Sequence, residues 1–490
     1  MKKLNNKMLR LAALFLIGFA VNGCNTLDQK PESALAQDGF YSNGTDAELG
    51  LIGTYNRLFT ENHIVGTYML LDMNSDDLTT GAGKFGYLME TRTDMSSVNN
   101  GTTDTYFNAP WVTIANANLF LEKVKDIAPT AFVGATTAND KRKDEVLGEA
   151  HFIRGLSYYY LAMLWRNVPL ILDFPSGALP EENQKPSVPQ SEVLAQVVKD
   201  LQVAETNLPN SLTQFSANER RGRASKWAAK GFLSRIRLQE KNWAEVVKLS
   251  DEIINSNQFT LTNPWTTMFL GDQNSAEAIL EIQAEAGPGF FNMGIHGWYY
   301  GNGEFRATDD AVAQYEKPRK DVRYENVIKD DKVSNKFLPQ PLWANEGIAR
   351  ANLVMLRLGE IYFNKAEALN ELSYETNKQA VLAILNTFRA RAQDPNFANR
   401  FRPTLPVGTT GIPLLTLADV DTQEKMRQAI RAEKRRELMF EGVRWLDLLR
   451  WDPTYAAQIV KASSPDRLYF PIPENEILLN KGVLKQNPGW

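Results

Sequence analysis

The chain has 490 residues, of which 43% are hydrophobic and 10% aromatic, so it can bury a large core. Its formal net charge of −4 argues against nucleic-acid binding, because phosphate contacts need Lys and Arg in clustered excess. The single cysteine excludes a disulfide framework and any cysteine-based metal site. His63, His151 and His296 lack the spacing of metal ligands, so we expect no metal and no cofactor.

The N-terminus has the form of a secretion signal. Basic residues precede an apolar run, 11–21, which is shorter than the roughly 20 apolar residues of a membrane-spanning helix. Gly23 and Cys24 follow this run, and the segment resembles a bacterial lipobox, in which the cysteine is lipidated and the preceding peptide removed. We expect a signal peptide over 1–23, a lipidated Cys24 and a polar tether over 24–37. A lone cysteine behind an ordinary secretion signal is the alternative.

Helical periodicity dominates the N-terminal region, which we assign to 38–257. Apolar residues recur there three or four positions apart. One long segment breaks near Lys241 and Asn242, which predicts a helical hairpin whose second helix starts at Trp243. The spacing predicts helices over 45–59, 111–124, 143–165, 191–207 and 225–256.

The C-terminal region, 258–490, contains a second helical hairpin. Leu358, Gly359 and Tyr362 have the spacing of a tetratricopeptide first helix, and residues 147–151 echo it weakly. A small residue at such a position lets two helices approach closely. The fold class is therefore all-α, with irregular tetratricopeptide-like helical hairpins, a long loop-rich region and few short strands. The expected elements are a strand over 278–283 and helices over 353–372 and 377–392.

Three segments are unusually long for loops, namely 72–106, 258–350 and 394–417. Long irregular segments in a compact domain are usually functional. Binding residues are therefore expected in these segments, and not on the helices.

Five groups of residues form a pattern along almost the whole chain. They are Leu27, Asp28, Pro31 and Phe40; then Gly148, Glu149, Ala150, Phe152, Arg154, Tyr159, Leu161, Val168, Pro169 and Leu170; then Arg357, Glu360, Tyr362, Ala366, Glu367, Ala368, Asn386, Arg389 and Arg391; then Glu433, Arg435, Glu437, Glu441, Gly442, Arg444, Asp447, Leu448 and Arg450; and last Phe470, Pro471, Ile472, Pro473, Glu476, Gln486, Asn487, Pro488, Gly489 and Trp490. In order and spacing they resemble the motifs of the SusD/RagB family of outer-membrane lipoproteins. Trp490 stands where tyrosine is commoner in that family.

The resemblance implies a function at the outer membrane. Members of this family are lipid-anchored at the cell surface, bind oligosaccharides or other nutrients, and form a lid on a SusC-like TonB-dependent barrel. We therefore expect a glycan-binding capture subunit of such a transporter. A peptide or another nutrient as cargo is the alternative, and so is a peptide-binding adaptor that uses the helical hairpins as its groove.

Two loops contain the side chains that glycan capture needs. A sugar ring has a face of C–H groups and a rim of hydroxyls, so it is bound by exposed aromatic rings with amide, carboxylate or guanidinium partners. The resemblance identifies no particular ligand residue, and the choice rests on composition. The candidates are Asp76, Phe85, Tyr87, Arg92 and Asn100 in the first loop, and Phe291, Trp298, Tyr299, Tyr300, Asn302 and Arg306 in the second. The alternative is that these aromatics pack the loops onto the helical body.

Clustered carboxylates raise the question of catalysis. Glu433, Glu437 and Glu441 share one helical face with Arg436 and Arg444, which predicts structural ion pairs along the helix, and the same holds for Asp321 and Arg323. A helical glycoside hydrolase would need two loop carboxylates, for which Asp76, Asp77, Asp309 and Asp310 are available. Such pairs are usually just solvated, so we expect no enzyme.

Overall fold

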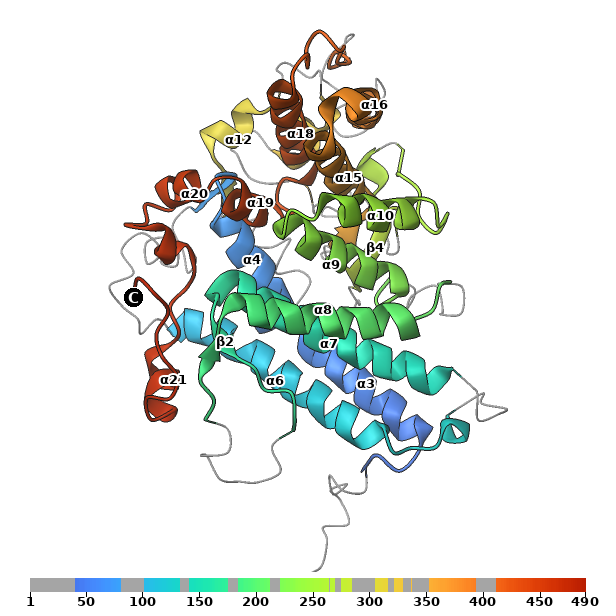
Figure 1. Ribbon diagram of the computed structural model, residues 1–490, viewed down its shortest axis with the longest axis vertical. Coiled ribbons are helices and arrows are strands. Elements are labelled where there is room, and N and C mark those ends of the chain that lie inside the picture. Colours follow the sequence, from blue (N-terminus) through green and yellow to red (C-terminus); the bar gives the residue numbers. More distant parts are fainter. Residues whose placement is uncertain are drawn as a thin grey trace, which may run out of the picture.

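The computed structural model describes residues 40–80, 101–132, 141–174, 184–211, 221–263, 265–268, 275–283, 305–315, 321–328, 336, 352–393 and 411–490. These residues are mostly helical, with a few short strands (Figure 1). The all-α fold class with few strands is therefore confirmed. Within the described ranges, no helix has the length and apolar character needed to span a bilayer.

A layer of long helices forms the N-terminal half, with α7 at its centre and α3, α6 and α8 packed against it (Figure 1). Asn43 caps the N-terminus of α3, because its side chain accepts hydrogen bonds from the backbone N–H groups of Thr45 and Asp46. Gly148 lets α7 approach the end of α8, since a Cβ there would lie 3.0 Å from the Cβ of Asn207. The helices of this layer are α3 (Gly44–Leu58), α6 (Gly101–Val124), α7 (Arg142–Trp165) and α8 (Gln190–Asn207).

A run of helical hairpins continues from this layer. The predicted break is confirmed, because α9 (Lys226–Gln239) ends before Lys241, whose φ is +57°, and Asn242 caps α10 (Trp243–Ile254). Helix α9 packs on α8 and α10, and α10 packs on α15. The second hairpin consists of α15 (Leu358–Leu372) and α16 (Tyr374–Arg391), and α18 (Gln423–Leu438) packs against both.

The helix predicted over 353–372 is wrong in its first turn. Residues Leu353–Arg357 form strand β6, which pairs antiparallel with β4 (Ala278–Ile282), the strand that was predicted. Both strands are buried at every position, so their apolar run has no solvent-facing residue that would distinguish strand from helix.

Three further boundaries differ from the sequence-based expectation. Helix α6 begins at Gly101 and contains Pro110, so the first loop is shorter than 72–106, and its start belongs to α4 and strand β1. Helix α16 begins at Tyr374, where Ser373 caps it. Helix α18 ends at Leu438, so Glu441 does not lie on it.

The remaining elements are short and lie mostly between these helices. They are η1 (Glu61–Val65), α4 (Gly66–Met73), β1 (Leu78–Thr80), η2 (Pro129–Ala131), β2 (Val168–Pro169), β3 (Ser187–Val188), η4 (Trp265–Met268), β5 (Phe305–Ala307), α12 (Asp309–Ala313), α13 (Val322–Val327), α19 (Arg444–Trp451), α20 (Pro453–Ile459), η5 (Pro465–Leu468) and α21 (Glu474–Leu479).

The C-terminal tail closes onto the N-terminal layer. The N–H of Phe470 donates to the carbonyl of Leu164 over 2.7 Å, and the Phe470 ring lies 5.7 Å from that of Trp165. The side-chain amide of Asn487 donates to the carbonyl of Trp165. The largest hydrophobic core accordingly takes residues from both ends of the chain.

Candidate functional site

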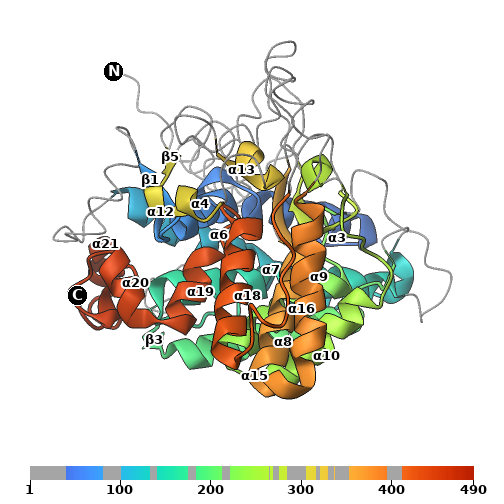
Figure 2. The same ribbon diagram turned by 90° about the horizontal axis from the view of Figure 1, so that it is seen from above.

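The start of the first predicted binding loop and the end of the second are joined in one small sheet. Strands β1 and β5 pair antiparallel, with Thr79 opposite Arg306 and Thr80 opposite Phe305. Strand β1 leads into the first loop and β5 follows the second, so the first loop begins beside the residues at which the second ends. Figure 2 shows β1 and β5 along the same edge of the molecule as α4, α12 and α13.

Of the predicted ligand residues, the structure describes Asp76 and Arg306. Arg306 is exposed on β5, as a ligand-binding residue must be. The others lie outside the described residues: Phe85, Tyr87, Arg92, Asn100, Phe291, Trp298, Tyr299, Tyr300 and Asn302, together with the lipidation site Cys24. For these residues, and for Arg306, the assignment stays a prediction.

Asp76 is not the solvated loop carboxylate that we expected. It is only 8% exposed, and Arg444 donates to both of its oxygens, Nε to Oδ1 and Nη2 to Oδ2, each over 2.7 Å. Burial alone would raise the pKa of Asp76, but the bonds and charge of Arg444, with the charge of Arg435, hold it below its ordinary value. Asp76 is therefore an ionised link between the base of the first loop and α19.

Arg435 binds the neighbouring carboxylates. Its Nε donates to Oδ1 of Asp77 over 2.6 Å, and its Nη1 donates to Oδ2 of Asp310 over 2.7 Å. Asp77 is buried too, so the expectation of solvation is wrong for this residue as well; burial and the nearby charge of Asp76 raise its pKa. Asp309 and Asp310 are exposed, as expected. Thr308 completes the junction, since its hydroxyl and N–H donate to the carbonyls of Asp76 and Asp77.

An aromatic residue that the sequence analysis missed lies at this junction. Tyr455 is 40% exposed, and its hydroxyl donates to Oδ2 of Asp76 over 3.3 Å. The carboxylate of Asp452 caps α20 by accepting from the backbone N–H of Tyr455. The composition that predicts ligand residues is that of the glycine-rich loops, whereas Tyr455 lies in the first turn of a helix. The sequence does contain one signal: Asp452 and Pro453 are typical of the start of a helix, and the aromatic Tyr455 follows them in its first turn.

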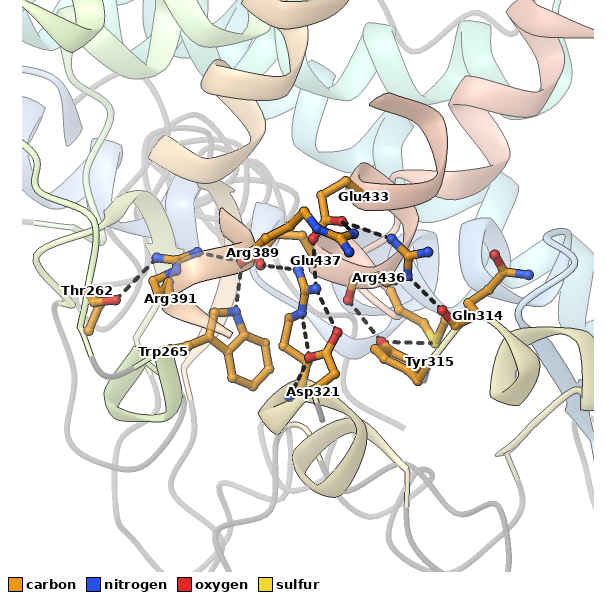
Figure 3. Close-up of polar contacts among 12 residues, drawn as sticks. Thr262, Trp265, Gln314, Tyr315, Asp321, Arg389, Arg391, Glu433, Arg436 and Glu437 are labelled. Carbon is orange, nitrogen blue, oxygen red and sulfur yellow. Dashed lines mark hydrogen bonds and ion pairs between the residues drawn. The ribbon is translucent and has the colours of Figure 1, made fainter. Parts of the chain in front are cut away.

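The charged residues of the family-like motifs converge in a second place, which we term the buried ionic cluster. Arg357 donates to Glu437 over 2.9 Å and to Glu441 over 2.6 Å, and Arg391 donates to Glu437 over 2.6 Å. Figure 3 shows part of this cluster around Glu433 and Glu437. Its members are Glu277, Asp321, Arg323, Lys336, Arg357, Arg389, Arg391, Glu433, Glu437 and Glu441.

The buried ionic cluster corrects the expected pattern of ion pairs. Of the residues predicted to pair along this helical face, Arg436 does bind Glu433 within α18, over 2.8 Å. The cluster joins distant elements instead, because the chain turns after α18 at Phe440 and Gly442, with φ values of +64° and +69°. Glu437 has no exposed surface, and its pKa lies well below the ordinary value despite burial, because Arg391, Arg357 and Arg323 surround it. A substrate cannot reach such a carboxylate, which supports the structural role predicted for it.

Fold and site together define a class of protein: a helical scaffold of tetratricopeptide-like hairpins that carries two long loops on one small sheet. Residues 331–467 match the model of the SusD family, and residues 27–238 match a model described as starch-binding associating with outer membrane. The resemblance to the SusD family that the sequence motifs indicate is therefore confirmed.

Two curated relatives match over nearly their full length. SusD-like protein P2 of Formosa agariphila is 22% identical, with 96% of this chain and 97% of the relative covered. SusD-like protein P25 of the same organism is 24% identical, with 97% of each chain covered.

Solved structures share the fold. A SusD homolog from Bacteroides thetaiotaomicron superposes with a TM-score of 0.72 at 19% identity, covering 94% of this chain and 100% of that one. A laminarin binding SusD-like protein gives a TM-score of 0.69 at 21% identity, covering 91% and 100%. The tetratricopeptide-like fold predicted from the sequence is thus confirmed.

Proposed function

We propose that this protein captures glycans at the outer membrane, anchored by a lipid on Cys24, and acts as the lid and capture subunit of a SusC-like TonB-dependent transporter. One observation supports the capture role above all: the first aromatic-rich loop begins beside the residues at which the second ends, because Thr80 and Phe305 pair across β1 and β5. Side chains from both loops can therefore act on one ligand. The similarity to a laminarin binding protein of the same fold agrees with a glycan as cargo.

The proposed role is binding without hydrolysis. A glycosidase needs one carboxyl group that keeps a proton to donate to the leaving oxygen. Asp76 is held ionised by two hydrogen bonds from Arg444, and Asp77 is only 1% exposed. Neither is suited to protonate a glycosidic oxygen. Release of reducing ends from a bound polysaccharide would contradict this part of the proposal.

The central test is affinity electrophoresis or calorimetry of the chain from Asn25 onward against a panel of polysaccharides, laminarin included. Trp298→Ala is the test variant, because Trp298 is a predicted ligand residue of the second loop. Trp243→Ala is the matched control, since Trp243 begins α10, which lies away from the β1–β5 edge in Figure 2. We expect the wild type and the control to bind one glycan, and Trp298→Ala to lose it. Binding of peptides but of no glycan would favour the alternative cargo.

Anchor and partner require separate experiments. Cys24→Ser should abolish labelling with a radioactive fatty acid and move the protein out of the membrane fraction. Gentle detergent extraction of the native membrane should bring down a large outer-membrane barrel with the wild-type chain. A lipid-labelled protein that repeatedly purifies alone would contradict the transporter partnership and leave glycan capture standing.

A further inference from the structure

We propose that Tyr455, with Asp310 beside it, forms a sugar-binding subsite on the helical body that takes one uncharged pyranose ring. This inference rests on the proposed function and adds to it a contact outside the two loops. It concerns three side chains: Asp310 on α12, Tyr455 on α20, and Asp76 in the segment between α4 and β1.

The exposure of Tyr455 is the first observation. Among the aromatic residues whose side chains the structure describes, Tyr455 is the most exposed, at 40%. The other rings are buried or partly buried, and many pack in the core, as Trp165 and Phe470 do. An isolated exposed side chain needs no explanation, so exposure alone does not make a site.

The second observation is that Tyr455 is held at both ends. Its backbone N–H donates to the capping carboxylate of Asp452 over 2.9 Å, and its hydroxyl donates to Asp76. Asp76 is itself fixed by the two 2.7 Å hydrogen bonds from Arg444. A ring held in this way loses little rotational freedom when a ligand packs on it, so more of the contact free energy is available for binding.

The third observation is a polar partner in reach of the same ligand. Asp310 has a side chain that is 59% exposed, and its Oδ2 accepts from Arg435. Arg435 also lies 3.3 Å from Oδ2 of Asp76, the atom that Tyr455 binds. The carboxylate of Asp310 is thus fixed near the ring and can accept a hydrogen bond from a sugar hydroxyl, the pairing of apolar face and polar rim that a pyranose requires.

The charges indicate which sugars fit. Asp309 and Asp310 are both exposed at this place. The guanidinium groups of Arg435 and Arg444 are mostly covered, with side chains 6% and 12% exposed, and they are engaged by Asp76 and Asp77. A uronate or a sulfated sugar packed on Tyr455 would meet the exposed carboxylates of Asp309 and Asp310, while Arg435 and Arg444 are already engaged, so the subsite favours an uncharged ring.

The position of the subsite connects it with the loops. Asp76 lies two residues before β1, and Thr308, which binds its carbonyl over 2.6 Å, follows β5 directly. A glycan chain held between the two loops can therefore reach Tyr455 at their common base. The subsite would lengthen the contact with an oligosaccharide and not replace the loop aromatics.

The test compares the affinities of wild type, Tyr455→Ala and Tyr455→Phe for the neutral glycan that the wild type binds best in the panel, measured by calorimetry. We expect Tyr455→Ala to bind about tenfold more weakly, because the aromatic contact is lost. Tyr455→Phe keeps the ring and should stay within about twofold of wild type. Thermal unfolding without ligand checks that both variants fold, and Asp310→Asn should weaken binding without lowering the unfolding temperature.

Several outcomes would overturn the inference. If Tyr455→Ala binds like wild type while Trp298→Ala does not, the subsite is wrong and the proposed function stands. If Tyr455→Phe loses as much affinity as Tyr455→Ala, the hydroxyl acts through Asp76 and the ring is no platform. Binding of acidic glycans alone would overturn the uncharged class, and a wild type that binds no glycan would overturn both the subsite and the proposed function.

Discussion

Arg357 and Glu437, which are 80 positions apart in the chain, form a buried ion pair with 2.9 Å between Nη1 and Oε1. Arg357 ends strand β6 and Glu437 lies in the last turn of α18. Glu437 also accepts from Arg391 on α16 and from the indole of Trp265. One carboxylate thereby joins four elements, and the conspicuous charged motif of the sequence is explained by folding and not by chemistry.

Neutralising this carboxylate should destabilise the protein strongly. Glu437→Gln keeps the shape but leaves Arg323, Arg357 and Arg391 with too little negative charge in a site that water cannot reach. We expect the free energy of unfolding to fall by about 3 kcal/mol, measured by urea denaturation. Glu375→Gln is the control, since the Glu375 side chain is 76% exposed and its pair with Lys378 should contribute nothing measurable. Equal stability of the two variants would show that the buried ionic cluster is dispensable.

Two helical glycines should respond to alanine in opposite directions. At Gly359 a Cβ would lie 2.5 Å from Nη1 of Arg357 and 2.9 Å from Oε1 of Glu277, so Gly359→Ala must push apart a buried ion pair. We expect a loss of about 2 kcal/mol. At Gly53, in α3, a Cβ meets nothing within 4 Å, and Gly53→Ala should gain about 0.5 kcal/mol from helix propensity. Urea denaturation of both variants measures the difference. If Gly359→Ala is as stable as wild type, the ion pair of Arg357 and Glu277 can move aside without loss of stability.

The local sequence pattern predicts most of the helices, because apolar spacing and helix caps depend on residues that are close together in the sequence. The break at Lys241 and Asn242 is one such case. Pattern failed where a distant partner decides the structure. The run 353–357 is a strand because β4 pairs with it. Glu441 does not continue the helical face because the chain turns at Phe440, and the N–H of Gly442 then donates to Asp72 over 2.8 Å.

The candidate site was predictable only in part for the same reason. Composition pointed to the two loops, but nothing in the sequence shows that β1 and β5 bring their ends together. Asp76 was chosen as a ligand residue, yet Arg444, far along the chain, engages it. Tyr455 was missed because its helix gives no sign of being exposed beside Asp76. The site therefore depends on ion pairs and strand pairing between residues far apart in the sequence, which local composition cannot predict.

His63 should make the protein sensitive to mild acid. It is fully buried in η1, where its Nδ1 shares a 2.9 Å hydrogen bond with the hydroxyl of Thr113, and burial lowers its pKa from 6.5 to about 3. Between these values the unfolded chain binds a proton that the folded chain does not, so stability is complete above pH 6.5 and falls as the pH drops. We expect a loss of about 2 kcal/mol from pH 7 to pH 5.

The measurement is urea denaturation at several pH values for wild type and His63→Phe. The phenylalanine variant cannot titrate, so its stability should change less over this range. Thr113→Val is the control, because it removes the shared hydrogen bond and keeps the buried imidazole; it should be less stable at every pH with the wild-type slope. Carboxylates such as Glu437 have lowered pKa values, so their stabilising effect is lost only as the pH falls below their ordinary value of 4.5, outside this window. An unchanged slope in His63→Phe would assign the acid sensitivity to other groups.

Asp76 and Arg306 are the two predicted ligand residues that the structure describes. Substitutions at these two positions should affect different properties of the protein. Asp76→Asn weakens the ion pairs with Arg444 and Arg435, and the Asp76 side chain is only 8% exposed. We therefore expect the free energy of unfolding to fall by about 2 kcal/mol. Glycan affinity should fall as well, because the segment before β1 shifts. Arg306 is exposed on β5, so Arg306→Ala should leave the unfolding midpoint unchanged and lower glycan affinity directly. Urea denaturation and calorimetry on the same preparations measure both properties. If Asp76→Asn loses affinity at full stability, Asp76 contacts the ligand itself, and its role as an internal link is wrong.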